Sequence, residues 1–92
     1  MHSMWYVYVL YSKKLVKRYV GFTNDLKRRF AEHSRGDSDF TNRGKPWILL
    51  YYSAFCNKQD AEEEEKYLKS GQGRERLDRL LINSLKENGG VA

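Results

Sequence analysis

The stretch that decides the fold is Arg18–His33, RYVGFTNDLKRRFAEH. Its first part, Arg18–Phe22, is rich in aromatic and β-branched residues and therefore predicts a β-strand. Thr23–Asp25 then supplies short oxygen-bearing side chains, which can accept hydrogen bonds from the free N–H groups at the start of a helix. We therefore expect a helix over about Asp25–Ser34, ending at Gly36.

Two further strands are expected around this unit. Met4–Tyr11 (MWYVYVLY) has the same aromatic and β-branched character, and the short polar break Lys13–Lys17 makes it the partner of Arg18–Phe22 in an antiparallel hairpin. Gly36–Pro46 is full of turn residues and is expected to be a loop. In Trp47–Phe55 (WILLYYSAF) the apolar residues are nearly continuous, which predicts a central strand covered on both faces.

The C-terminal part of the chain predicts two more helices. Asn57 can cap a helix that runs to about Ser70, with Gly71 as its C-terminal stop. Leucines recur every four residues at positions 77, 81 and 85, which predicts an amphipathic helix over about Arg74–Asn88. The order ββαβαα is that of an α+β fold, and we expect the 92 residues to form a single domain over 1–92.

The net charge of +5 is unevenly distributed. Residues 1–50 carry ten Lys and Arg against four Asp and Glu, whereas residues 51–92 carry seven against eight. A basic half beside a nearly neutral half indicates an anionic partner, with nucleic acid first, although general solubility would also account for it.

The single cysteine, Cys56, excludes a disulfide framework and a cysteine-based zinc site within one chain, and we expect it to be a small core residue. The apolar run Met4–Tyr11 is too short to cross a membrane and lacks the pattern of a secretory signal. We therefore expect a soluble, cytoplasmic protein with no membrane partner.

The first helix directs charged side chains towards its apolar face. On a helical wheel with about 100° per residue, Leu26 and Phe30 define the apolar stripe. Arg29 and His33 fall within that stripe, at about −60° and −20° from Leu26, whereas Lys27 falls outside it. For His33, the alternative to a functional role is a hydrogen-bonded, partly buried imidazole.

The second helix repeats this pattern. Glu65 falls in the stripe that Ala61 and Leu68 define, at about 40° from Ala61. A buried carboxylate is costly unless it is paired or binds a metal ion. Two interpretations stay open: an Arg29–Glu65 ion pair without function, or a polar site that both helices share.

The tyrosines of the hairpin add a chemical possibility. Tyr8 and Tyr19 lie on its two strands, where tyrosines are usually packing residues. A neighbouring cation lowers the pKa of a phenol, which can then orient or deprotonate a water molecule. Arg29 can neutralise a phosphoryl oxygen, and Glu65 can hold one Mg²⁺ whose other positions go to water and phosphate. Together these groups would form a phosphodiester hydrolysis site.

Three motifs in the first half of the chain occur together. Tyr6–Tyr8 reads YVY, Tyr19–Gly21 reads YVG, and Thr23–Gly36 has the pattern TxDLxxRxxxHxxG. This combination resembles the GIY-YIG nuclease superfamily, and the likeness to its small stand-alone members covers about residues 4–82. Tyr6 stands where the first motif has glycine, and Phe22 where repair-type relatives often have lysine. Those relatives also carry an asparagine in the region that reads RLD here, at 76–78.

The resemblance implies a three-stranded antiparallel sheet flanked by helices, one divalent ion (Mg²⁺ or Mn²⁺) and hydrolysis of DNA phosphodiester bonds. It implies that Tyr8 and Tyr19 are the active-site tyrosines, one of which acts as the general base or orients it. Arg29 would stabilise the phosphorane, His33 would support the site or contact phosphate, and Glu65 would be the metal ligand. The expected activity is that of a structure-selective endonuclease linked to DNA repair or recombination.

Basic residues outside this pocket extend the expected DNA interface. They lie at the hairpin tip, on the exposed side of the first helix and in the 36–46 loop, where they can contact phosphates without reading sequence. The residues expected to bind DNA are Lys13, Lys14, Lys17, Arg18, Lys27, Arg28, Arg35, Arg43 and Lys45. The expected partner is DNA, with branched or damaged DNA included, and we favour a monomer.

Two other functions remain open on the sequence. Phe22 and the missing late asparagine favour a non-catalytic nucleic-acid-binding module with a nuclease fold. A third possibility is a scaffold whose apolar C-terminal helix docks on another protein.

Overall fold

The computed structural model describes residues 4–89. Its centre is a three-stranded antiparallel sheet in the order β2-β1-β3, formed by β1 (Trp5–Ser12), β2 (Lys17–Thr23) and β3 (Trp47–Phe55). β1 and β2 form the expected antiparallel hairpin. The predicted α+β class and the antiparallel sheet are therefore confirmed.

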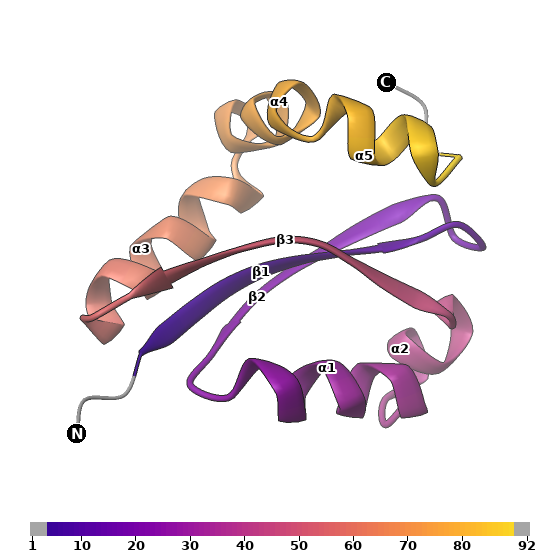
Figure 1. Cartoon of the computed structure of the whole chain (residues 1–92), viewed down its shortest axis with the longest axis horizontal. Coiled ribbons are helices and arrows are strands. Elements are labelled where there is room, and N and C mark those ends of the chain that lie inside the picture. The colour runs from indigo at the N-terminus through magenta and orange to yellow at the C-terminus, as the bar shows by residue number, and fades with distance from the viewer. Residues whose placement is uncertain (1–3, 90–92) are drawn as a thin grey trace.

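The helices form one layer on each face of the sheet (Figure 1). One face is covered by α1 (Leu26–Arg35) and α2 (Asp39–Gly44). The other face is covered by α3 (Lys58–Lys69), α4 (Gly71–Leu80) and α5 (Ile82–Glu87). The result is a helix–sheet–helix sandwich, so side chains from α1 and α3 can meet only past an edge of the sheet.

β1 supplies side chains to two separate cores, because successive residues of a strand point to opposite faces of the sheet. Val7, Val9 and Tyr11 pack towards α3, α4 and α5. Tyr8 and Leu10 pack towards α1 and α2. All five side chains are buried, which makes β1 the best-covered element of the fold.

The prediction that Trp47–Phe55 is the central strand is wrong. β1 lies between the other strands, and β3 lies at an edge of the sheet. The difference shows in the side chains of β3, where Tyr52 is 52% exposed and Ala54 is also exposed. The two strands have similar runs of apolar and aromatic residues, so continuity alone could not tell which one has neighbours on both sides.

The predicted loop 36–46 contains a helix, α2, that the sequence analysis missed. Ser38 caps it by accepting a hydrogen bond from the Thr41 N–H, and the Thr41 hydroxyl oxygen accepts one from the Ser38 N–H. The indole N–H of Trp47 donates to the Thr41 carbonyl at 2.9 Å, which ties α2 to the start of β3. The signal was a capping box with Thr in place of the usual Glu or Gln.

Other boundaries also differ from the predictions. Gly71 does not merely stop the second helix but begins α4, and Ser70 caps it by accepting a hydrogen bond from the Gly73 N–H. The single helix expected over 74–88 is divided at Leu81 into α4 and α5. Cys56 is exposed rather than a core residue.

The apolar faces of α4 and α5 are used within the chain. Leu77, Leu81 and Leu85 are buried in the core beneath α3, α4 and α5, at most 5% exposed. Their burial removes the apolar face that the scaffold hypothesis required. Between residues 4 and 89, no helix is long and apolar enough to cross a membrane.

Replacing Leu77 by alanine should lower the free energy of unfolding by about 2–5 kcal/mol, because it opens a cavity under a fully buried side chain. Urea denaturation followed by far-UV circular dichroism measures this change. Leu80→Ala is the matched control, since Leu80 is on the same helix and 45% exposed. Equal losses in the two variants would show that α4 does not pack as described.

Candidate active site

The site begins with a close approach between the two strands of the hairpin. Tyr8 of β1 is paired with Gly21 of β2, and the phenol ring of Tyr8 lies across Gly21. A Cβ atom at position 21 would lie 2.5 Å from the Tyr8 hydroxyl oxygen and 2.7 Å from the ring carbon that bears it. Glycine at this position therefore lets a tyrosine of the central strand extend its hydroxyl over the edge strand.

The Tyr8 hydroxyl is the meeting point of two side chains from α1. Arg29 Nε donates to the Tyr8 oxygen at 3.4 Å. His33 Nε2 lies 3.2 Å from the same oxygen, in a buried contact. The sequence separation of Tyr8 from these residues shows that the contacts depend on the packing of α1 against the sheet.

α1 is positioned so that Arg29 and His33 reach this oxygen. Asp25 caps the helix by accepting a hydrogen bond from the Arg28 N–H, and Gly36 ends it in the left-handed conformation with φ of 74°. Leu26 and Phe30 pack on the core around Tyr8. The stripe predicted from the helical wheel is thus the face that meets the sheet.

His33 and Arg29 differ in exposure. His33 is buried at 5% exposure, whereas 44% of the Arg29 side chain is exposed. The guanidinium of Arg29 lies at the border of the pocket, where its NH1 group also bonds Glu32 at 3.3 Å. Arg29 therefore has one contact to Tyr8 and an open side that faces solvent.

Tyr19 completes the aromatic wall of the site. Its ring is stacked on that of Tyr8 with centroids 6.3 Å apart and meets His33 edge-on at 4.6 Å. Phe40 and Trp47 flank Tyr19 on the α2 side at 5.9 and 6.2 Å. These rings fix the orientation of both tyrosines and of the imidazole.

Burial raises the pKa of the Tyr8 phenol above its usual value. The hydrogen bond from Arg29 acts in the opposite direction, and the charges of Tyr19 and Glu65 add to the increase. Arg29 thus acts on this pKa in the expected direction, but desolvation outweighs it and the pKa of Tyr8 is raised overall. At neutral pH Tyr8 carries its proton.

Burial, together with the positive charge of Arg29, lowers the pKa of His33 below its usual value. The imidazole is therefore neutral at pH 7. Arg29 can only donate, so the phenol oxygen accepts from Arg29, and the Tyr8 proton is free to point at an unprotonated His33 Nε2. Phenol, imidazole and guanidinium thus form one polarised chain.

Protonation of His33 should destabilise the fold. Because its folded-state pKa is lowered, the folded chain binds fewer protons than the unfolded chain near pH 6. The contribution of neutral His33 to the free energy of unfolding is fully present above about pH 6.5. It is lost as the pH falls from there through the folded-state pKa. Denaturant midpoints measured over this range should slope for the wild type, and the slope should flatten in His33→Gln. An identical pH dependence in the two proteins would contradict this assignment.

Glu65 lies on the packed side of α3, as predicted, with 18% of its side chain exposed. Lys69, one turn further along the helix, donates to its carboxylate at 3.1 Å. Glu65 is also close enough to Tyr8 for its charge to raise the pKa of the phenol. Of the two interpretations left open on the sequence, the Arg29–Glu65 ion pair does not occur in the described part of the chain, where Arg29 pairs with Glu32 and Glu65 with Lys69.

The carboxylate of Glu65 suits an ion such as Mg²⁺ better than a transition metal that several side chains would bind. Across residues 4–89, no group of three or more His, Cys, Asp or Glu side chains is close enough to hold a metal ion. Mg²⁺ commonly takes only one or two protein carboxylates and leaves its other positions to water and phosphate. The partly exposed carboxylate of Glu65 matches that pattern, and Lys69 shows that a cation is already accommodated there.

The predicted DNA-binding residues are distributed over several surfaces. Lys17 and Arg18 line a cleft along the outer edge of β2. Lys27 lines a separate groove with Tyr6 and Tyr52, towards β3. The other predicted cations are exposed, namely Lys13, Lys14, Arg28, Arg35, Arg43 and Lys45.

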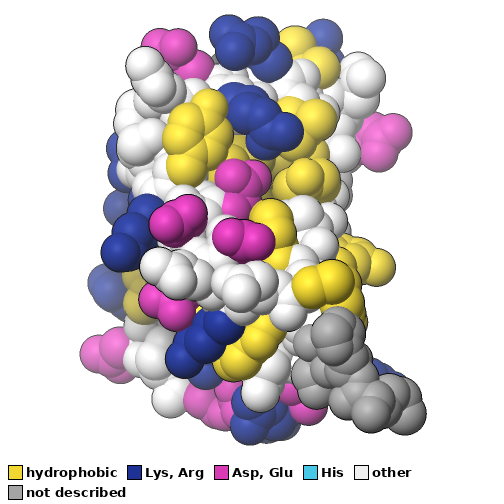
Figure 2. Space-filling view, turned by 90° about the vertical axis from the view of Figure 1, so that its left-hand side faces the viewer, with side chains coloured by type: hydrophobic (Ala, Val, Ile, Leu, Met, Phe, Trp, Pro, Cys, Tyr) yellow, Lys and Arg dark blue, Asp and Glu magenta, His cyan; other side chains and the backbone are white. Residues whose placement is uncertain are grey.

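Three of these cations have carboxylate partners, so their charges are partly neutralised. Arg18 bonds Asp78 at 2.6 Å and Arg35 bonds Asp37 at 3.0 Å. Arg28 lies 3.9 Å from Asp25. Acidic and basic side chains also occur together on the side of the molecule that carries the start of α3 (Figure 2). The positive charge is therefore local rather than spread evenly over the surface.

The sequence profile of the GIY-YIG catalytic domain matches residues 4–78, which include the hairpin, α1 and Glu65. The chain belongs to the GIY-YIG family. Its YIG motif supplies Tyr19 and the glycine, Gly21, over which Tyr8 lies. The family accounts for a nuclease-type site at the edge of the sheet.

Individual relatives span nearly the whole of this GIY-YIG chain. A UPF0213 protein of Clostridium perfringens is 35% identical over 83 residues, covering 89% of this chain and 88% of the relative. A UPF0213 protein of Streptococcus pneumoniae is 32% identical and covers 94% of each. The solution NMR structure of a UPF0213 protein from Bacillus halodurans superposes with a TM-score of 0.53 at 32% identity, over 84% of both chains.

Sequence reasoning missed several residues that shape the site. The role of Gly21 follows only from the path of the Tyr8 side chain, although the YVG tripeptide marks the position. Lys69 was not selected, although its spacing of four residues from Glu65 is that of a helical ion pair. Arg74 and Asp78 reach the edge of β2 through the turn between α3 and α4, which no local pattern indicates.

Proposed function

We propose that this protein is a divalent-metal-dependent endonuclease that hydrolyses DNA phosphodiester bonds. One observation carries the proposal: the Tyr8 hydroxyl, extended over Gly21, meets Arg29 and a neutral His33 within the charge field of Glu65. A proton acceptor, a phosphate-neutralising cation and an ion-binding carboxylate are the groups that such hydrolysis needs.

Glu65 would hold one Mg²⁺ or Mn²⁺ in place of its contact with Lys69. The bound ion would polarise a non-bridging oxygen of the scissile phosphate and offset its negative charge. Arg29 has an open side towards solvent, so it can contact a second phosphate oxygen while its Nε keeps the bond to Tyr8. Its charge would then stabilise the additional negative charge of the phosphorane.

The Tyr8–His33 pair gives a route for the proton of the attacking water. As the phenol oxygen takes this proton, the proton that Tyr8 already carries passes to Nε2 of His33. The phenol is neutral before and after the transfer, so its raised pKa is no obstacle, and the positive charge appears on the imidazole. The resulting hydroxide attacks phosphorus, the bond to the leaving sugar oxygen breaks, and this oxygen takes up a proton from solvent while the imidazolium of His33 releases one. Tyr19 would orient the water and the Tyr8 ring.

Structure-selective cutting, with a place in DNA repair or recombination, completes the proposal. Lysines and arginines that contact phosphates place a duplex without reading its sequence. We expect branched or damaged DNA to be preferred because an open junction exposes a single backbone to a site at the edge of a sheet.

The activity is tested with purified protein, supercoiled plasmid and labelled forks, flaps and linear duplexes, each with Mg²⁺, Mn²⁺ or EDTA. The expected result is nicked plasmid and faster cutting of branched DNA than of linear duplex, both abolished by EDTA. Cleavage that persists in EDTA, or cleavage of no substrate with either metal, would contradict the proposal.

A non-catalytic binding module is the second candidate. It is favoured by Phe22 and by the Lys69 contact that occupies the Glu65 carboxylate. In the same experiments it predicts retention of forks in gel-shift assays without any product.

A further inference from the structure

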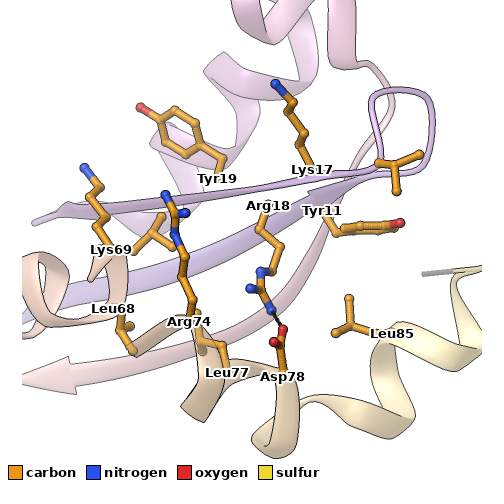
Figure 3. A pocket seen from close by; sticks show the side chains of 12 residues that line it. Tyr11, Lys17, Arg18, Tyr19, Leu68, Lys69, Arg74, Leu77, Asp78 and Leu85 are labelled. Atoms are coloured by element: carbon orange, nitrogen blue, oxygen red, sulfur yellow. Dashed lines mark hydrogen bonds and ion pairs between the residues drawn. The ribbon is translucent and has the colours of Figure 1, made fainter. Parts of the chain in front are cut away.

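A cleft of about 720 Å³ runs along the outer edge of β2, between this strand and α3, α4 and α5 (Figure 3). It begins at Tyr19, which also belongs to the candidate active site, and extends towards the hairpin tip at Lys17. Its floor is apolar, with Leu68 and Leu77 among the lining residues. The cleft therefore meets the candidate active site at Tyr19, whose ring lies on the far side of β2 from Leu68 and Leu77 (Figure 3), and otherwise lies outside the site.

The rim of the cleft is strongly basic. It carries Lys17 and Arg18 from β2, Lys69 from α3 and Arg74 from α4, against the single carboxylate of Asp78. In Figure 3 the side chains of Lys69 and Arg74 extend from the helices towards the level of β2 and Tyr19. Four cations from three elements line this one groove, with Lys17 extending from β2 to the side opposite Arg18 (Figure 3).

Arg18 differs from the other cations. It points away from Lys17 and towards α4, where its NH1 group donates to Asp78 (Figure 3). Only 20% of its side chain is exposed, compared with 56% for Asp78. Asp78 thus neutralises the best-buried cation of the cleft, and Glu65 pairs with Lys69, which leaves Lys17 and Arg74 as its available positive charges.

The cleft has the length of a short piece of nucleic-acid backbone. Strand residues rise about 3.3 Å each, so the lining edge of β2 from Val20 to Lys17 spans about 10 Å. This length accommodates a few consecutive phosphates of one strand. The cations of the cleft come next to the candidate metal ligand at Lys69, which bonds Glu65.

We propose that the β2 cleft binds the DNA strand on one side of the scissile bond, with Arg74 as the main contact to its phosphates. Lys17 and Lys69 flank Arg74, and Asp78 limits the affinity by holding Arg18 in an ion pair. This inference rests on the proposed function for its ligand, because the strand that enters the cleft is the one that passes Tyr8 and Glu65.

Binding is measured without catalysis, by fluorescence anisotropy of a labelled single-stranded oligonucleotide and a fork, in EDTA over a salt series. Arg74→Ala should weaken binding about five- to tenfold and reduce the slope of log K against log salt by about 0.7–0.9. Arg79→Ala is the control, because Arg79 is an exposed arginine of α4 outside the cleft and its loss changes the net charge equally. Asp78→Asn should tighten binding about two- to fivefold, since it releases Arg18.

A second experiment determines on which side of the scissile bond the DNA strand in the cleft lies. Once the cleavage position is known, neutral methylphosphonate linkages are placed on one side of it or on the other. On the side that enters the cleft, they should weaken binding by the wild type and leave binding by Arg74→Ala unaffected. On the other side, they should weaken binding by both proteins equally. Equal effects of Arg74→Ala and Arg79→Ala, or weaker binding by Asp78→Asn, would overturn the proposal. Far-UV circular dichroism confirms that each variant is folded. Because the anisotropy requires no turnover, loss of the cleft effect and loss of nuclease activity are separate results.

Discussion

Replacing Glu65 by glutamine should reduce metal-dependent plasmid nicking by about 100-fold or more. Glutamine keeps the size and hydrogen-bonding capacity of the side chain but removes the charge that would hold Mg²⁺ or Mn²⁺. An ion that polarises a phosphoryl oxygen contributes several kcal/mol to the transition state, which corresponds to a rate factor of at least this size. The measurement is the initial rate of nicking at saturating metal.

Glu63→Gln is the matched control, because Glu63 is an exposed carboxylate on the same helix. It changes the net charge equally and should leave the rate within about twofold of the wild type. Glu65→Gln should also keep nearly the thermal stability of the wild type, since an i,i+4 pair whose Lys69 side chain is 55% exposed contributes little to folding. Equal nicking by both variants would exclude Glu65 as the metal ligand.

Replacing Gly21 by alanine should reduce the nicking rate by about 100-fold although no charged or titratable group is removed. The added Cβ would lie 2.5 Å from the Tyr8 hydroxyl oxygen, so the Tyr8 ring must move away from β2. Its contacts to Arg29 and His33 would then lengthen. A displacement of about 1 Å at a reacting group costs rates of this order.

Gly71→Ala serves as the control for this variant. Gly71 begins α4, and a Cβ there would meet nothing within 4 Å. It should retain wild-type nicking and the same or higher stability, because alanine is the better helix former. The Gly21 variant should remain folded by circular dichroism. A folded Gly21→Ala protein with wild-type activity would show that the position of the Tyr8 hydroxyl is not critical.

The sequence was most informative where a charged or polar residue lies on the apolar face of its helix. Arg29, His33 and Glu65 were selected because each lies on the packed face of a helix, and the structure places Arg29 and His33 on Tyr8. Helical periodicity carries this information, since it is set by local geometry. The choice of Tyr8 and Tyr19, in contrast, came from the family resemblance, because tyrosines in strands are usually packing residues.

The features that were missed depend on contacts between distant parts of the chain. The strand order follows from which strand is covered on both sides, and Met4–Tyr11 and Trp47–Phe55 have similar apolar runs. The sign of the Tyr8 pKa shift depends on the balance between burial and Arg29, which only the packed structure defines. The ion pair of Arg18 with Asp78 likewise requires the position of α4 against β2.

The most direct test of the central claim is a crystal structure with Mn²⁺ and a non-cleavable oligonucleotide, with the metal located by anomalous scattering. We predict one ion at about 2.0–2.2 Å from the Glu65 carboxylate, in contact with a phosphate oxygen that faces Tyr8 and Arg29. The Lys69 side chain should have moved away from Glu65. An ion bound elsewhere, or Glu65 still paired with Lys69 beside an ordered phosphate, would contradict the account.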